Sequence, residues 1–341
     1  MAGTVTLRIV TGGLQTTVQD LGRMGQQRSG IPVCGAMDRL ALRIGNMLVG
    51  NEDSAAALEA SLIGPAITFE QRALIALTGG DLDATINGTD VPPWHAISVP
   101  PGTTLRCGAQ PRVGCRSYVA IAGGVDVPLV FGSRSTYLRA EFGGFEGRAL
   151  RSGDVLLSGA PSTLSGRIAD ALRESGAAAV TARWSIGASL RPRYSDDPVV
   201  RLIAGAHHDL LDDESRERLG SETFRISASS DRMGYRLTGV SLSLRAPVEL
   251  LSEGVAFGTV QLPPGGEPIV LMADHQTTGG YPRLGEVASI DLPLVAQLKP
   301  GDRLRLRIIS IDEAHQLYLA QERDLALARV GIALRHSRAT T

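Results

Sequence analysis

The sequence predicts a protein built mainly from β-strands, with a few helices. Glycine supplies 40 of the 341 residues, and many glycines stand in pairs, such as Gly12-Gly13, Gly79-Gly80 and Gly143-Gly144. Paired glycines give access to backbone conformations with positive φ and mark tight turns. Short apolar runs of strand length lie between these turns, which favours a strand-rich fold over a helical bundle.

The expected strands follow these apolar runs along the chain. The first is residues 5–10, which alternate between apolar and polar side chains and end at a glycine pair. Six more runs are expected as strands: 67–69, 74–77, 84–86, 96–99, 104–106 and 116–122. Strand patterns resume later at 199–204, 254–261, 268–273 and 303–310. The pattern therefore predicts two strand-rich regions.

A helix is expected over residues 38–49, where Leu40, Ile44 and Met47 recur at helical spacing behind a capping Asp38. Shorter helices are expected near 166–174 and 209–219, and a helical tail over 312–334. Residues 15–35 are polar and broken by glycines, so a long ordered loop is expected there.

The length suits two domains. We expect a first β domain over residues 1–160 and a second over 184–310. Residues 161–183, rich in alanine, serine and glycine, are a candidate linker. Residues 311–341 form the expected C-terminal tail.

Composition excludes several classes of protein. The net charge is −1 without a basic run, so neither nucleic acid nor a membrane surface is an expected partner. Three cysteines without a CxxC motif disfavour a disulfide framework and a zinc site, and no metal is expected. No apolar stretch approaches the length of a membrane span, so a cytoplasmic protein is expected.

Familiar catalytic motifs are absent from the sequence. There is no GxSxG nucleophile elbow, no HExxH and no GxxxxGK[ST] loop. Lys299 is the single lysine, and it does not follow a glycine. A nucleotide would therefore need arginines and backbone N–H groups of this chain, or a partner subunit.

Two polar segments are candidate binding loops. Residues 16–23 offer Gln19, Asp20 and Arg23 for substrate, or else form an ordered loop in which Asp20 pairs with Arg23. Residues 229–236 offer Asp231 and Arg232, because arginine forks suit carboxylates and phosphates. The alternative for this second segment is a salt-bridged turn.

The strongest candidate is the polar segment 273–283, which follows an apolar run at 269–272. Asp274 or His275 can act as a general base, although a structural histidine is the alternative. Six further residues of this segment are candidate substrate-binding groups: Gln276, Thr277, Gly279, Gly280, Tyr281 and Arg283.

Several motifs together resemble one family. They are TTVQDLGRMG at 16–25, GAMD at 35–38, NMLVGN at 46–51, VAIAGGVDVP at 119–128, GSRST at 132–136, SDRMGYRL at 230–237 and ADHQTTGGYPRLG at 273–285. The family is the biotin-dependent carboxyltransferase-like proteins, which include allophanate hydrolase subunit 2, the C subunit of 5-oxoprolinase and the Kip-inhibitor antagonist.

The resemblance implies two cyclophilin-like β-barrel domains and a hetero-oligomer with a subunit-1 (Kip-inhibitor-like) protein. A lactam-utilisation subunit is a further implied partner. The implied activity is ATP-dependent 5-oxoprolinase, which opens 5-oxoproline to glutamate, or an allophanate-hydrolase-like reaction, with ATP held mainly by a partner. The alternatives are a biotin-dependent carboxyltransferase subunit and a regulatory subunit that antagonises a kinase inhibitor. Under the hydrolase reading, Arg23, Arg232 and Arg283 are the candidates to bind anions.

Overall fold

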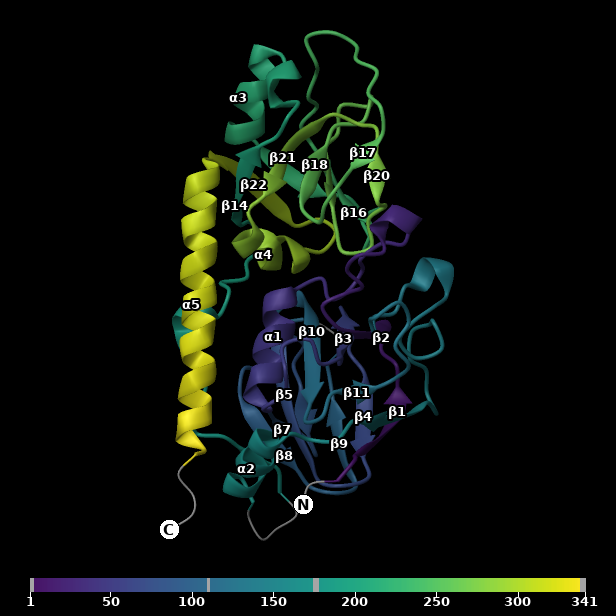
Figure 1. Cartoon of the computed structure of the whole chain (residues 1–341), viewed down its shortest axis with the longest axis vertical. Coiled ribbons are helices and arrows are strands. Elements are labelled where there is room, and N and C mark those ends of the chain that lie inside the picture. Colours follow the sequence, from purple (N-terminus) through teal and green to yellow (C-terminus); the bar gives the residue numbers. More distant parts are fainter. Residues whose placement is uncertain (1–2, 109–110, 174–177, 338–341) are drawn as a thin grey trace. The chain divides into compact units, whose positions relative to one another are not determined.

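The computed structural model describes residues 3–108, 111–173 and 178–337, and most of its elements are strands (Figure 1). The chain divides into two compact units, each made of separate stretches of sequence. Unit 1 comprises Met1–Arg23, Asp38–Arg191 and Asp324–Thr341. Unit 2 comprises Met24–Met37 and Pro192–Arg323.

Unit 1 contains two antiparallel sheets. The order of the seven-stranded sheet is β11 (Val125–Asp126), β12 (Val155–Ser158), β1 (Thr6–Thr11), β4 (Ala66–Phe69), β9 (Thr103–Arg106), β6 (Thr85–Ile86) and β7 (Thr89–Asp90). The order of the six-stranded sheet is β13 (Val180–Thr181), β8 (Ala96–Val99), β5 (Ala73–Asp81), β10 (Val113–Ile121), β3 (Ala57–Ser61) and β2 (Gln15–Gln19).

The two sheets of unit 1 share one apolar core. Leu7 and Phe69 from the first sheet and Ile75 and Val119 from the second belong to the same buried cluster. Since side chains alternate along a strand, the polar neighbours of these residues point to the outer faces. The resulting β-sandwich fixes which residues of β2, β3, β5 and β10 lie outside the core.

Helix α1 (Arg39–Leu48) packs against β5 and β10 of the six-stranded sheet. The Asp38 side chain caps it by accepting a 2.9 Å hydrogen bond from the Ala41 backbone N–H. This confirms the predicted helix and its cap. Unit 1 also holds α2 (Thr163–Ala171) and two 3-10 helices, η2 (Leu138–Ala140) and η3 (Ala188–Leu190).

Unit 2 is a closed barrel. Its strands follow the order β14 (Val199–Ala204), β21 (Arg283–Val287), β18 (Thr259–Gln261), β19 (Ile269–Leu271), β16 (Gly234–Thr238), β15 (Thr223–Ile226) and β22 (Arg303–Ile309). The barrel is filled by apolar side chains such as Leu202, Phe224 and Leu237. A closed barrel leaves no free sheet edge, which protects these strands from pairing with other chains.

Smaller elements surround the barrel. They are α3 (Asp213–Ser221), α4 (Leu292–Ala296), the 3-10 helices η1 (Gln27–Ser29), η4 (His208–Leu210) and η5 (Ser289–Asp291), and the ribbon of β17 (Glu253–Gly254) with β20 (Thr278–Gly279). The last helix, α5 (Ile311–Arg335), begins in the stretch assigned to unit 2 and ends in the stretch assigned to unit 1. No helix of the described residues is long and apolar enough to cross a membrane.

The predicted mainly-β fold is confirmed, and most expected strands lie within a residue or two of the observed ones. The loop expected over residues 15–35 is wrong at its start, because β2 (Gln15–Gln19) pairs along β3 and buries Val18 in the core. The strand expected over 254–261 is two separate strands, because a turn at residues 257–258 interrupts it.

The units group residues differently from the contiguous domains expected from the sequence. Met37 is buried in the barrel core, which ties Met24–Met37 to unit 2. The candidate linker contains α2 and β13, because Ser162 caps α2 and Ile168 is buried. Part of the helix expected at 166–174 lies outside the described residues, since residue 174 is not described.

Candidate functional site

In unit 1, the carboxylate of Asp20 at the end of β2 binds the segment 132–136. It accepts hydrogen bonds from the hydroxyls of Ser133 (2.7 Å) and Ser135, and from the backbone N–H of Arg134 (2.6 Å). The Gly22 N–H donates a further bond of 2.8 Å. Four donors satisfy both carboxylate oxygens, so Asp20 links the motif at residues 16–25 to the motif at residues 132–136. The alternative of an ordered loop in which Asp20 pairs with Arg23 is therefore wrong for Asp20.

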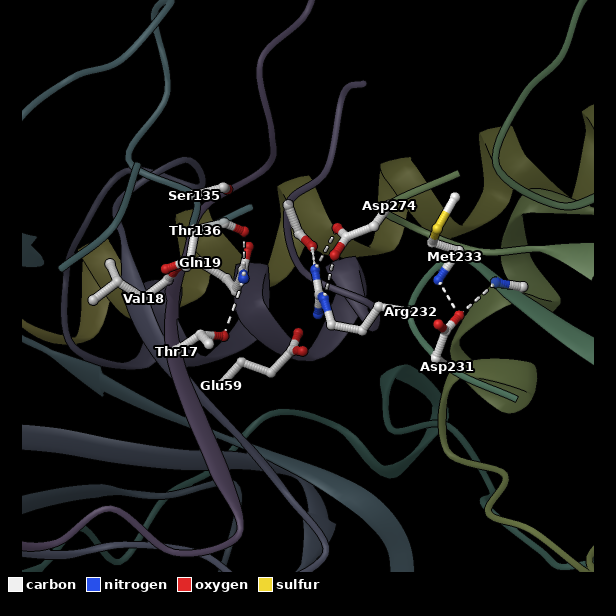
Figure 2. A network of polar contacts seen from close by, with 12 residues as sticks. Thr17, Val18, Gln19, Glu59, Ser135, Thr136, Asp231, Arg232, Met233 and Asp274 are labelled. Atoms are coloured by element: carbon white, nitrogen blue, oxygen red, sulfur yellow. Dashed lines mark hydrogen bonds and ion pairs between the residues drawn. The ribbon is translucent and has the colours of Figure 1, made fainter. Parts of the chain in front are cut away.

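We call the hydrogen-bonded cluster of Asp20 with the segment 132–136 the Asp20 latch. Gln19 precedes Asp20 in the chain and is fully buried. Its Nε2 donates to the Thr17 hydroxyl (3.0 Å) and to the Thr136 carbonyl (3.2 Å), as Figure 2 shows. Within the described residues, no donor reaches its Oε1 atom. A buried carbonyl oxygen without a donor is costly, so this atom is suited to accept a hydrogen bond from a ligand.

Arg23 is also fully buried. Its Nη2 donates to the Ser135 carbonyl, and its guanidinium stands over the Phe142 ring at 4.9 Å from the centroid. In the part of the chain that the structure describes, its Nε and Nη1 have no acceptor. A buried cation with two unsatisfied N–H groups is a natural site for a carboxylate or another small anion.

A row of polar side chains that the sequence did not single out crosses the outer face of the six-stranded sheet. Thr17, Glu59, Tyr118 and Thr78 are direct cross-strand neighbours on β2, β3, β10 and β5. The Tyr118 hydroxyl donates to Glu59 (2.7 Å) and accepts from the Asp38 N–H (2.7 Å). Burial and the nearby Glu59 and Asp38 charges raise the pKa of Tyr118, so this phenol stays protonated.

Only the register of the strands reveals this row. Glu59 and Tyr118 are 59 positions apart in the sequence, and each lies in a mainly apolar strand rather than in a polar segment. The one sequence signal that could have found this row is Glu59, a charged residue inside the apolar strand β3. A buried carboxylate needs a hydrogen-bond or ion-pair partner.

In unit 2, Arg232 and Asp274 form a buried two-point ion pair. The Arg232 Nε and Nη2 donate to the two Asp274 oxygens at 2.9 and 3.0 Å (Figure 2). The Arg232 Nη2 also donates to the Gly35 carbonyl at 2.7 Å, which ties the segment Met24–Met37 to the barrel. Because both Asp274 oxygens accept hydrogen bonds from Arg232, this ion pair has a structural role, and we call it the unit 2 clamp.

His275 follows directly and is buried. Its Nδ1 lies 2.5 Å from the Gln276 carbonyl, so the ring carries its proton on Nδ1 and donates it there. The exposed Gln276 and half-buried Thr277 flank this ring at the start of the β20 ribbon.

Asp231 occupies a turn, in agreement with the structural alternative for its segment. Its Oδ1 accepts from the backbone N–H of Met233 (2.8 Å) and of Gly234 (3.3 Å), as Figure 2 shows for Met233. Such a turn orients Arg232 toward Asp274. Asp231 itself is exposed.

Gly279, the first glycine of the pair in the candidate loop, has a packing reason. A Cβ on Gly279 would stand 2.5 Å from Nε2 of Gln261, a buried side chain of β18. Arg283 forms an ion pair with Glu253, which joins β21 to the β17–β20 ribbon. Gly280 and Tyr281 are exposed.

Glu286 is a second carboxylate that sequence reasoning missed. It accepts from the Thr259 hydroxyl at 2.8 and 3.0 Å across β18 and β21. Burial raises the pKa of Glu286, and the Thr259 bond and the Arg283 charge oppose that rise. No group of three metal-ligating side chains occurs among the residues described.

A model of one protein family matches most of the chain. The family, described as the carboxyltransferase domain, subdomain A and B, matches residues 29–308. The chain belongs to this family. The resemblance read from the sequence motifs is therefore confirmed.

Curated relatives and solved structures agree with this assignment. The chain is 38% identical to the 5-oxoprolinase C subunit of Escherichia coli over 93% of its own length and 96% of the relative's. It is 36% identical to the Haemophilus influenzae protein of the same name, covering 89% of this chain and 91% of that one. The K. lactis urea amidolyase structure matches at a TM-score of 0.85 and 30% identity over 96% of this chain, which spans 20% of that longer chain.

Proposed function

We propose that this chain is a subunit of an ATP-dependent 5-oxoprolinase, which hydrolyses 5-oxo-L-proline to L-glutamate together with partner subunits. The observation that carries the proposal is the match to two bacterial 5-oxoprolinase C subunits at 36% and 38% identity over nearly their full lengths. In this reaction water adds to the ring carbonyl carbon and the C–N bond breaks. The bond's electron pair and a proton then go to nitrogen.

The unit 1 cluster supports a role in substrate recognition. 5-Oxoproline carries a carboxylate, which suits the unsatisfied N–H groups of Arg23, and a lactam N–H, which suits the Oε1 atom of Gln19. Both groups are buried, and a buried polar site rejects analogues that leave it unpaired. We therefore assign Arg23 and Gln19 to the substrate.

His275 is our candidate general base. Its Nδ1–H donation to the Gln276 carbonyl supports this role, because it fixes the orientation of the ring next to the polar loop. Asp274 is held at both oxygens by Arg232, which favours an orienting role for that carboxylate over proton transfer.

The candidate anion-binding residues that the structure describes do not fit a triphosphate. Of the three arginines considered for anions, Arg232 is paired with Asp274 and Arg283 with Glu253. Lys299 is paired with Asp302 at 2.8 Å. Arg23 offers donors for one small anion, so we place ATP on a partner subunit.

The second candidate function is biotin-dependent carboxyl transfer. The family description and the TM-score of 0.85 to a urea amidolyase favour it. The same buried donors would then receive a carboxyl group or urea. A purely regulatory role is the third reading, and it requires no function of His275.

The test is to co-express this chain with a subunit-1-type protein and a lactam-utilisation subunit, then to measure glutamate release from 5-oxoproline. Release that needs ATP and persists with avidin supports the hydrolase. A stable complex that releases no glutamate but carboxylates urea in the presence of biotin carboxylase components, and is blocked by avidin, supports the alternative.

A matched histidine pair sharpens the test. His275→Gln is expected to lower kcat by about 100-fold or more if the ring is the base. His95→Gln is the control, because the His95 Nδ1 also contacts a nearby backbone carbonyl, that of Pro93, at 2.9 Å, in unit 1. Equal activity of the two variants would show that His275 is not the general base.

A further inference from the structure

A cavity of about 230 Å³ lies in unit 1, beside helix α2. Its walls come from four places in the chain: the residues before β1, the start of β5, the residue after β10, and α2 with its flanking residues. None of the residues that line it belongs to the Asp20 latch or to the candidate binding loops. The functions considered above therefore leave this cavity without a ligand.

The floor of the cavity is apolar and its rim is charged. Val5, Ala73 and Leu74 line it and are buried. Arg72 is half-buried, and the other two charged residues of the lining, Asp170 and Arg173, are exposed. Ligand sites commonly combine an apolar wall with a few polar groups that fix the orientation of the ligand. This division suits a small molecule with a short aliphatic chain and charged groups at its ends.

The wall formed by α2 is held in place by the chain itself. Ser165 and Ala169 are one helical turn apart and line the cavity together, and Arg173 follows just after the helix. The Ser165 hydroxyl donates a 2.6 Å hydrogen bond to the carbonyl of Val49, the residue that ends α1. The cavity is therefore formed before a ligand binds, which lowers the cost of binding.

The charged groups on the rim are not neutralised by the rest of the chain. The Arg72 side chain donates one long hydrogen bond, to the Ser98 hydroxyl at 3.4 Å. Within the described residues, neither Asp170 nor Arg173 forms an ion pair. A solvated arginine on a surface needs no partner, so either arginine alone would indicate nothing. Here two guanidinium groups and one carboxylate border the same cavity.

The position of Asp170 is the informative part of this arrangement. Asp170 lies in the last turn of α2 (Thr163–Ala171), where the partial negative charge of the helix end disfavours a carboxylate. Arg173, just beyond that end, is favoured by the same charge. Helix stability therefore accounts for Arg173 and not for Asp170. A cationic group of a ligand beside Asp170 accounts for both the carboxylate and its place.

We propose that this cavity binds an acidic amino acid such as L-glutamate. Its two carboxylates match Arg72 and Arg173, its ammonium group matches Asp170, and its methylene groups contact the apolar floor. An engineered cavity of about 150 Å³ binds benzene, so a volume of 230 Å³ suits a ligand of about nine or ten non-hydrogen atoms.

The binding site goes beyond the proposed function and does not rest on it. Glutamate is also the product of the reaction proposed above, so a 5-oxoprolinase subunit would carry a site for the product of its own complex. Only this link rests on the proposed function. The binding test uses the purified full chain without ATP or partner subunits, so its outcome is separate from that of the glutamate-release assay.

The test is isothermal titration calorimetry of the full chain with L-glutamate. A dissociation constant below about 1 mM is expected. Arg72→Gln and Arg173→Gln should each raise it about tenfold or more, because each removes a charge-assisted hydrogen bond. Arg167→Gln is the matched control, since Arg167 is an exposed arginine of α2 that does not line the cavity. No binding at about 10 mM glutamate, or an equal loss in Arg167→Gln, overturns the proposal.

Ligand analogues test the class of ligand on the wild-type chain, so this arm does not depend on the folding of any variant. Glutarate lacks the ammonium group and glutamine lacks the second carboxylate, and each should bind about tenfold more weakly than glutamate or worse. Asp170→Asn should abolish the preference for glutamate over glutarate. Glutarate or inorganic phosphate that binds the wild-type chain as tightly as glutamate contradicts an amino-acid site.

Discussion

The polar clusters of the two units are built from the same residue types and differ in how fully they are satisfied. In unit 2, Arg232 is matched by both oxygens of Asp274 and by the Gly35 carbonyl. In unit 1, the Arg23 guanidinium keeps two N–H groups without an acceptor among the described residues, and Gln19 keeps a carbonyl oxygen without a donor.

The difference teaches that a family motif rich in charge is not by itself a binding site. The unit 2 arginine is neutralised within its own chain, so removing its partner should cost mainly stability. The unit 1 arginine has unused hydrogen-bonding capacity, so altering it should cost mainly substrate affinity. Substitutions in the two clusters separate these outcomes.

The largest expected effect is at the unit 2 clamp. Asp274→Ala leaves a buried guanidinium unpaired and should lower the free energy of unfolding by about 3–5 kcal/mol. Glu253→Ala removes the partner of the more exposed Arg283 and should cost only about 0–1 kcal/mol. Urea unfolding of the two variants measures the contrast, and equal losses would show that Arg232–Asp274 is no clamp.

The next effect is at the Asp20 latch. Asp20→Ala leaves the hydroxyls of Ser133 and Ser135 and two backbone N–H groups without their acceptor. It should lower the unfolding free energy by about 2–4 kcal/mol, against about 1 kcal/mol for Ser133→Ala. Thermal unfolding in which the serine variant loses as much as the aspartate variant would contradict the central position of Asp20.

Tyr118→Phe tests the row on the outer face of the sheet. The loss of a hydroxyl that both donates and accepts should cost about 1–3 kcal/mol. Because burial raises the pKa of Tyr118, the folded chain keeps this proton when the unfolded chain loses it near about pH 10. Its contribution to stability is therefore present below that pH and is lost as pH rises through the window above it.

The measurement is the difference in unfolding free energy between wild type and Tyr118→Phe at about pH 9 and about pH 11. The advantage of wild type should shrink at the higher pH. A constant difference would mean that Tyr118 titrates alike in both states.

The smallest expected effect is at Glu286. Since burial raises the pKa of this carboxyl, Glu286→Gln should change stability at neutral pH by less than about 1 kcal/mol, and in the stabilising direction. The amide still accepts from Thr259. A clear loss of stability at neutral pH would show that the charge itself is needed.

Much of the fold was predictable from local pattern. Apolar runs between turns located the strands, and Asp38 with the repeats behind it located α1 to within a residue. The loop expected over residues 15–35 failed because the strand character of Gln15–Gln19 comes from pairing with β3, which the local sequence does not display. The division into units was also not predicted. Met37 packs in the barrel core, whose other residues come from Val200 onward, and the local sequence does not show this long-range contact.

The site was predictable as a set of segments and not as a set of roles. Gln19, Asp20, Arg232 and Asp274 are buried, and their roles in binding or catalysis stay predictions. The partners that decide their roles, Ser135 for Asp20 and Gly35 for Arg232, come from over a hundred residues away. Glu59 and Tyr118 are recognised only once the strand register is known.

The most direct test is the Michaelis constant for 5-oxoproline of the reconstituted complex, with ATP, carrying wild-type chain, Arg23→Lys or Arg148→Lys. Arg148 is a matched control, since its guanidinium also stands over a phenylalanine, Phe145, at 5.1 Å, while its charge is satisfied by Glu146 and Asp154. The account predicts that KM rises about tenfold or more for Arg23→Lys, through the loss of a charge-assisted hydrogen bond, and stays unchanged for Arg148→Lys. An unchanged KM for Arg23→Lys, or a wild-type complex that forms no glutamate, would contradict it.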